Sequence, residues 1–173
     1  MLLRNWKSKS WALIKKEPLG SITLLLSIFS FAWVLVMNAT AWASSDIRSL
    51  IESEANAAVN KDTSKAMSLY TDQGTIFDWQ SRSNWNGATE IRQRYSNLPQ
   101  FKWLVHANVN IEEIQLFPGT ARARSVTEGV MQSGGAQVLF GEDIWEFKRV
   151  NRIPFLPWTG EWKISGFTFD KPL

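Results

Sequence analysis

The hydrophobic pattern of the chain begins with a long stretch that carries no charge. Between Glu17 and Asp46 lie 28 consecutive uncharged residues, and the apolar side chains are densest over residues 24–37. A basic segment precedes this stretch, and small residues follow its apolar core at Ala39, Ala41 and Ala43. A basic end, an apolar core and small closing residues are the three parts of a secretory signal. We therefore expect the chain to be directed to a membrane, with the residues after about Ser44 on its far side.

Two fates are open for this stretch. Cleavage after Ala43 would release residues 44–173 as an exported protein, and the alternating alanines at 39, 41 and 43 suit such a cut. Retention would leave residues 19–43 as a transmembrane anchor, because these 25 residues exceed the roughly 20 that a bilayer requires. In both cases residues 1–43, a signal peptide or an anchor, precede a folded domain of residues 44–173 that lies outside the cytoplasm, in a periplasmic or extracellular space.

Helical periodicity follows the uncharged stretch. Apolar residues recur at spacings of three and four over residues 47–61, which predicts an amphipathic helix that Ser45 or Asp46 would cap. Asp62 is placed to cap a second, short helix over residues 64–70. Residues 71–74 have the composition of a turn.

The next segment combines a hairpin with a third helix. Residues 75–79 are rich in strand formers, and residues 84–87 close a small hairpin. The third helix is expected from about Ala88 until Pro99 ends it, with Glu90 and Arg94 spaced for an ion pair.

After Pro99 the period changes from helical to alternating. Trp103, Val105, Val109 and Ile111 share one face of a strand, and His106 lies on the other. Three further strands are expected over residues 120–132, 137–150 and 161–170, separated by turn-forming segments. Helices followed by long strands predict an α+β domain in which helices cover one face of a curved antiparallel sheet.

Charge and composition exclude several classes of function. The residues up to Ala43 carry five basic side chains and one acidic side chain, a net charge of +4. Because the whole chain has a net charge of +3, the remaining residues have a net charge of −1. The folded part therefore lacks the basic surface that nucleic-acid binding requires. A single histidine and no cysteine make a zinc site unfavourable, and we expect neither a metal nor a cofactor. Glu142, Asp143 and Glu146 are expected on both faces of a strand, at solvated edges.

The residues of the folded part resemble a known family along almost their whole length. The resemblance is carried, in order, by Ala57-Ala58, Lys61-Asp62, Met67 to Asp72, Asn86-Gly87, Ile91-Arg92, His106 with Asn110, Thr120 to Ser125, Trp145 to Phe147, Trp162 to Ile164 and Phe167 to Asp170. These pieces resemble the SnoaL-like branch of the nuclear transport factor two-like (NTF2-like) superfamily. The resemblance implies a cone of curved sheet wrapped around helices, whose open end is commonly a pocket for a hydrophobic small molecule.

Three side chains are candidates for catalysis. His106 is the only histidine, and the family often carries one on this strand facing the cavity, where it would act as an acid or base. Asp78 lies beside Trp79, whose indole would raise the pKa of the carboxyl and make it a base. Tyr95 could reach the cavity from the third helix and donate a hydrogen bond to an oxyanion. Each of the three also has a purely structural interpretation.

Aromatic residues are the most unusual part of the composition, and they supply the candidates for ligand binding. Trp79, Trp103, Trp145 and Phe147 could line a cavity for a flat apolar molecule, or they could fill the cone. The loop over residues 149–158 is also apolar for a surface connection, and it could cap the cone, pack on a partner subunit or touch the membrane.

Three functions follow from these features. The first is an exported domain that binds a hydrophobic small molecule in its cone or associates with a second copy of itself as a dimer. The second is a cofactor-free isomerase, cyclase or dehydratase that uses His106 with Asp78 or Tyr95. The third is a scaffold for assembly, tethered to the membrane through residues 19–43.

Overall fold

The protein is described from a computed structural model that defines residues 18–97, 104–131, 137–151, 153 and 159–172. Two compact units are distinguished within the chain, Met1–Ala41 and Trp42–Leu173. The predicted residues Trp103 and 154–158 lie outside the described part.

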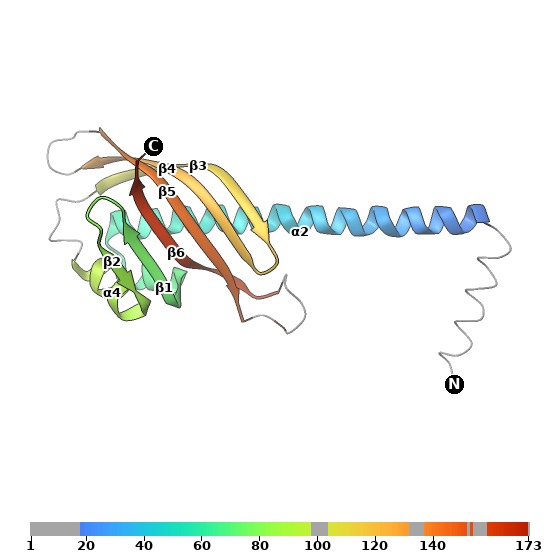
Figure 1. Cartoon of the computed structure of the whole chain (residues 1–173), viewed down its shortest axis with the longest axis horizontal. Coiled ribbons are helices and arrows are strands. Elements are labelled where there is room, and N and C mark those ends of the chain that lie inside the picture. Colours follow the sequence, from blue (N-terminus) through green and yellow to red (C-terminus); the bar gives the residue numbers. More distant parts are fainter. Residues whose placement is uncertain (1–17, 98–103, 132–136, 152, 154–158, 173) are drawn as a thin grey trace. The chain divides into compact units, whose positions relative to one another are not determined.

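Helix α2, Pro18–Asn60, is the longest helix of the described residues and runs for 43 residues without a break (Figure 1). In the first unit most of its described side chains are apolar and exposed, with Phe29 at 70% and Trp33 at 68%, and its polar residues are uncharged. Such an exposed, uncharged and largely apolar helix suits a membrane. Among the described residues it is the one helix long and apolar enough to cross a bilayer, a test that a signal sequence passes too.

The continuity of α2 corrects one prediction. We expected a separate helix to begin at Ser45 or Asp46, but both residues lie inside α2. The residues before them include three alanines, which are the strongest helix formers, so nothing stops the helix from continuing. The predicted helix and the apolar stretch are therefore one element.

The second unit contains a sheet of six strands, with α3, Thr63–Leu69, and α4, Gly87–Asn97, beside it. The strands follow in the spatial order β2-β1-β6-β5-β4-β3, and the sheet is not closed. All neighbours are antiparallel except β1 and β6, which are parallel. Their bounds are β1 Tyr70–Asp78, β2 Asn84–Asn86, β3 Leu104–Phe117, β4 Thr120–Met131, β5 Gln137–Val150 and β6 Glu161–Lys171. The predicted α+β class is confirmed.

Of the predictions for the segment after α2, the cap of α3 is confirmed and the turn at residues 71–74 is wrong. Asp62 caps α3, where its carboxylate accepts a hydrogen bond from the Lys65 amide at 2.8 Å. The expected turn at residues 71–74 is instead part of β1. Its turn-like composition produces a shift in the β1–β6 register between Tyr70 and Thr75, which is a bulge rather than a reversal of the chain.

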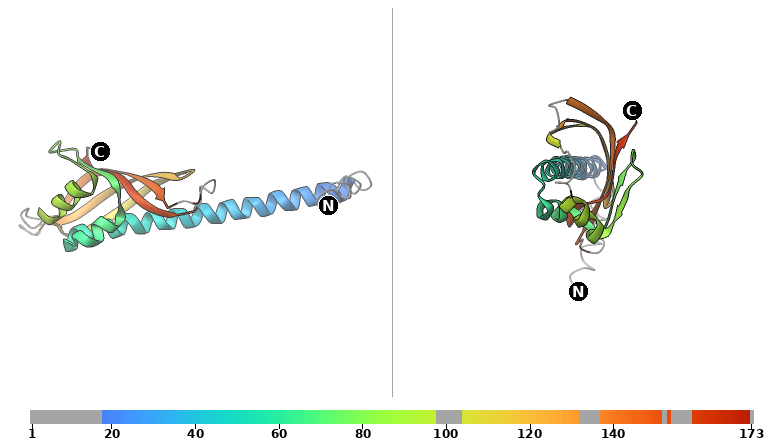
Figure 2. Two further views of the ribbon diagram at one scale, coloured as in Figure 1. Left: turned by 90° about the horizontal axis from the view of Figure 1, so that it is seen from below. Right: turned by 90° about the vertical axis from the view of Figure 1, so that its left-hand side faces the viewer.

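Glycines help the sheet to curve around the helices (Figure 2). Gly141 in β5 has φ +95°, and a Cβ there would lie 2.5 Å from the carbonyl oxygen of Lys171. Only glycine fits this close approach, and the β5–β6 register shifts directly after it.

The core lies between the concave side of the sheet and the helices. Helix α2 contributes a stripe that includes the fully buried Ile47 and Ile51, which are one turn apart. The sheet contributes small, aliphatic and aromatic side chains at Ala121, Ala123, Trp145, Phe147, Ile164 and Phe167. One polar residue of α2, Glu54, interrupts this apolar packing.

Candidate functional site

Glu54 lies on the buried stripe of α2, seven positions after Ile47, and its side chain is only 4% exposed. Its Oε1 accepts a hydrogen bond from the Tyr95 hydroxyl of α4 and another, of 3.3 Å, from the Tyr70 hydroxyl at the start of β1. Three polar side chains from three elements thus meet in the core.

The two tyrosines are as deeply buried as the carboxyl that they contact. Tyr95 is fully buried and Tyr70 is 4% exposed, and their ring centroids lie 6.4 Å apart. Burial raises the pKa of both hydroxyls well above the ordinary value, and the nearby Glu54 raises both further. Both side chains therefore remain hydrogen-bond donors at all physiological pH values.

Arg94 supplies the positive charge of this cluster. It is 8% exposed, and its guanidinium carbon lies 5.1 Å from the ring centroids of Tyr95 and Phe169 and 5.2 Å from that of Trp85. Contacts of this kind with aromatic faces are attractive, and more so away from water.

The predicted ion pair of Arg94 with Glu90 is wrong. Arg94 points into the core, and the Glu90 carboxylate instead accepts a hydrogen bond of 2.7 Å from the Asn86 amide ahead of α4.

The balance of these effects leaves the pKa of Glu54 raised. Burial raises it most, while the Tyr95 hydrogen bond, the Arg94 charge and the Tyr70 hydrogen bond lower it. We name the set Glu54, Tyr70, Arg94 and Tyr95 the Glu54 cluster.

A second buried carboxyl, Asp143 on β5, lies near the Glu54 cluster. It is 2% exposed and accepts a hydrogen bond from the Thr127 hydroxyl of β4. Burial is the main cause that raises the pKa of Asp143 to about 7. The Thr127 hydrogen bond lowers this pKa, and the charges of Glu54 and Asp170 raise it. Asp170 on β6 follows the same trend, since burial and the charge of Asp78 raise its pKa to about 6.

The position of Asp143 corrects the prediction of a solvated edge. Asp143 alternates with Trp145 and Phe147, so the three share the core-facing side of β5. Glu142 and Glu146 lie on the other side, where Glu142 pairs with Lys171 at 2.7 Å and Glu146 pairs with Arg122 at 2.7 Å.

Aromatic rings surround this polar interior. Trp145 and Phe147, both predicted to bind a ligand, are each 1% exposed. Trp145 stacks on Phe167 at 3.8 Å between centroids, and its indole nitrogen donates to the Ser125 hydroxyl at 2.9 Å. Trp79, the third predicted residue, is half-buried beside Phe77, at the end of β1. Their role in ligand binding stays a prediction.

The three predicted catalytic residues have different surroundings. Tyr95 belongs to the Glu54 cluster. The Asp78 carboxylate holds the turn after β1, where it accepts hydrogen bonds from the Gln80 amide at 2.9 Å and the Ser81 hydroxyl at 2.6 Å. His106 is exposed on β3, at the far edge of the sheet.

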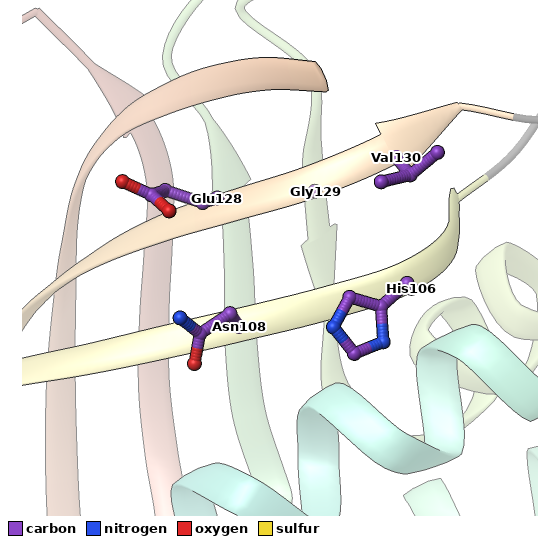
Figure 3. Close-up of a pocket in the computed structure, with 5 residues that line it drawn as sticks. All are labelled: His106, Asn108, Glu128, Gly129 and Val130. Atoms are coloured by element: carbon purple, nitrogen blue, oxygen red, sulfur yellow. The ribbon is translucent and has the colours of Figure 1, made fainter. Parts of the chain in front are cut away.

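The surroundings of His106 form a separate shallow pocket of about 150 Å³. His106 and Asn108 border it from β3, with Glu128, Gly129 and Val130 from β4 (Figure 3). Tyr95 contacts Glu54, whereas none of the five residues that line the His106 pocket belongs to the Glu54 cluster. Within the part of the chain that the structure describes, no three acidic or histidine side chains are arranged to hold a metal ion.

Sequence reasoning missed Glu54, Arg94 and Asp143, although a signal for two of them was present. Glu54 lies at helical spacing from Ile47 and Ile51, and Asp143 lies at strand spacing from Trp145. A charged residue in phase with an apolar face is the sign of a buried polar group.

Comparison with known proteins rests on structure alone. No family model matches the sequence, and no curated protein matches it either. A ketosteroid isomerase-like protein from Erwinia carotovora atroseptica has 18% identity and a TM-score of 0.56, covering 74% of this chain and 96% of its own. An NTF2-like protein with a cystatin-like fold from Novosphingobium aromaticivorans has 14% identity and a TM-score of 0.60, covering 79% and 86%.

A third similar structure is a domain of unknown function with a cystatin-like fold from Nostoc punctiforme. It has 10% identity and a TM-score of 0.62, and the match covers 75% of this chain and 77% of that one. At these identities the likeness concerns the fold alone, and it confirms the curved sheet around helices that the sequence resemblance implied. The chain has the cystatin-like fold of the NTF2-like proteins.

Proposed function

We propose that residues 42–173 bind a small, largely apolar molecule that carries a hydrogen-bond acceptor such as a ketone. The observation that carries this proposal is the Glu54 cluster, in which two tyrosine hydroxyls converge on one buried carboxyl. A ligand oxygen could take the place of the Glu54 carboxylate as acceptor for one of these hydroxyls. The rings of Trp145, Phe147 and Phe167 would then provide apolar walls.

The energetics of the cluster support a functional role. Taking ionisable groups out of water is unfavourable, and well-packed apolar residues of similar volume are often equally stable or more so. Groups with a pKa shifted by burial and a specific partner are concentrated at functional sites. The neighbour from Erwinia is described as ketosteroid isomerase-like, which supports a steroid ketone as the first probe.

A second candidate function, an isomerase, is favoured by Asp143. A general base works best when its pKa is close to the operating pH, and burial raises that of Asp143 to about 7. In this reaction Asp143 takes a proton from the carbon between a ketone and a carbon–carbon double bond, and a tyrosine hydroxyl stabilises the dienolate oxygen. Asp143 then returns the proton at the far carbon of the dienolate, so that the double bond moves into conjugation with the ketone. Tyr95 would act as the predicted hydrogen-bond donor to the oxyanion. Asp143 would act as the base, a role that the sequence suggested for His106 or Asp78.

We also propose that α2 is retained as an anchor and that the domain is exported. The alanines at 39, 41 and 43 lie inside α2, and Ala43 is 7% exposed among the core residues. A protease would have to unwind the helix to cut after Ala43. Sequencing the amino end of the mature protein tests this proposal, since a start at Ser44 would exclude an anchor.

Ligand binding is tested with the full chain in detergent. We expect a steroid ketone to quench tryptophan fluorescence and to add its mass once per chain in native mass spectrometry. Tyr95→Phe should weaken binding at least tenfold, whereas the matched control Thr75→Val, which removes an exposed hydroxyl of β1, should bind as the wild type does. Equal affinities of these two variants would contradict the assignment, and a mass of two chains without ligand would favour self-association.

The isomerase is tested by exchange of the ketone's α-hydrogens for deuterium. We expect the exchange rate to rise with pH around a midpoint of about 7 and to be lost in Asp143→Asn. Binding without exchange would leave the first function and exclude the second.

A further inference from the structure

The end of the second unit near Arg149 gathers three segments that are distant in the sequence. The Arg149 amide donates to the carbonyl oxygen of Gly119 at 2.9 Å, in the turn between β3 and β4. Its guanidinium donates to the carbonyl oxygen of Gly160 at 2.8 Å, just before β6. Asp46 of α2 lies close enough for its charge to act on the same guanidinium. Arg149 therefore joins one helix and two connections at one end of the sheet.

Large apolar side chains are exposed at this same end. Among the described residues after Ala41, four large apolar side chains have half or more of their surface exposed: Trp42 at 72%, Val105 at 50%, Phe117 at 50% and Ile153 at 58%. Trp42 lies one helical turn before Asp46 and on the same side of α2. Phe117 ends β3, directly before the turn that contains Gly119. Ile153 lies in the connection between β5 and β6, and the Ile153 amide donates a hydrogen bond to the Thr159 hydroxyl at 2.9 Å.

Three of the four exposed residues thus surround Arg149, and we name Trp42, Phe117 and Ile153 the Arg149 face. Val105 lies near the other end of β3, twelve residues before Phe117 and therefore about 40 Å away along the strand. The exposed apolar surface is concentrated at one end of the unit rather than scattered.

The position of Trp42 in the chain indicates what covers this face. Trp42 directly follows the apolar part of α2, and tryptophan is enriched where a membrane meets water. If residues 19–41 cross a bilayer, Trp42 must lie at its surface, whatever angle the domain takes. Exposed Lys148 and the half-buried Arg149 add positive charge, partly balanced by Asp46, and lipid surfaces with anionic headgroups attract such charge.

We propose that the Arg149 face rests on the lipid surface, with Phe117 and Ile153 inserted between the headgroups. Apolar side chains of surface-bound segments reach about 5–10 Å into this boundary. The inference rests on the proposed anchoring of α2 and is independent of ligand binding. It gives the exposed side chains of Phe117 and Ile153 a role as a second contact with the membrane.

The experiment uses the full chain in vesicles of phosphatidylcholine and phosphatidylglycerol. Because the chain has no cysteine, one fluorophore is attached at a time to Phe117→Cys, Ile153→Cys or Val105→Cys, the matched exposed control. Quenching by lipids that carry a spin label near the headgroup is compared with quenching by aqueous iodide. A fourth label, at Trp33→Cys, reports whether α2 is in the bilayer.

We expect lipid quenching at Phe117→Cys and Ile153→Cys to be several-fold stronger than at Val105→Cys, and iodide quenching to be correspondingly weaker. Lipid quenching at Trp33→Cys alone would keep the anchor and overturn the proposed face. No lipid quenching at any position would overturn both. Protection from iodide without lipid quenching would show that a protein, for instance a second copy, covers the face, and it would overturn the proposal too.

Discussion

The buried carboxyl of Asp143 makes the stability of the domain depend on pH in a calculable way. In the unfolded chain an aspartate ionises near its ordinary pKa of 3.8, whereas burial holds Asp143 protonated up to about pH 7. Between these values the folded state binds more protons than the unfolded state. The free energy of unfolding therefore falls as the pH rises through this window, and above about pH 7 the fall is complete.

The size of the effect follows from the shift. Each pKa unit corresponds to about 1.4 kcal/mol, so a shift from 3.8 to about 7 corresponds to a loss of about 4 kcal/mol between pH 4 and pH 8. Asp143→Asn cannot ionise, and its amide oxygen can still accept the Thr127 hydroxyl. We therefore expect the variant to gain about 2–4 kcal/mol over the wild type from pH 4 to pH 8.

Urea unfolding of the full chain in detergent, followed by tryptophan fluorescence, measures this difference at several pH values. Asp170 and Glu54 also have a raised pKa. Both residues are present in the wild type and in the variant, so their contributions to the pH dependence largely cancel in the difference. Asp72→Asn, which removes an exposed carboxyl of β1, is the matched control and should run parallel to the wild type. Parallel curves for Asp143→Asn as well would refute the reasoning.

Three further substitutions test the interior. Tyr95→Phe removes a donor from the buried Glu54 and should lower the free energy of unfolding by about 1–3 kcal/mol, with unchanged stability arguing against the contact. Trp145→Phe deprives the buried Ser125 hydroxyl of its partner and should lower the melting temperature, while a further Ser125→Ala change should restore part of the loss. Gly141→Ala places a Cβ on a residue with φ +95° and against the Lys171 carbonyl oxygen. It should lower the free energy of unfolding by more than about 1 kcal/mol in thermal unfolding. An unchanged stability would mean that the backbone of β5 has a different conformation at this residue.

Periodicity was sufficient to predict most of the architecture. The alternation after Pro99 places Val109 and Ile111 against the core, as the structure has them, and the Asp62 cap marks the start of α3. Local sequence signals gave wrong predictions where the preceding residues favoured another structure. Asp46 can cap a helix only if the helix starts there, and the alanines before it carry α2 straight through.

The Glu54 cluster was less accessible to sequence reasoning because its members are spread over three elements, α2, β1 and α4. Tyr95 was found, since a tyrosine on an apolar helix face attracts notice. Its partner Glu54 is 41 residues earlier, and no local pattern pairs the two. Arg94 has the spacing for a surface ion pair with Glu90, and only the packing of Trp85 and Phe169 around it shows that it is buried.

The single parallel pairing in the sheet has a consequence for when the domain can form. Strand β6, the last strand along the chain, lies between β1, the first, and β5. The hairpin of β1 and β2 therefore cannot join the meander of β3, β4 and β5 until β6 has been synthesised. Pairings between segments so distant in sequence are slow to form. If the domain is exported as proposed, this late pairing would keep it in the extended state that passage through a translocation pore requires.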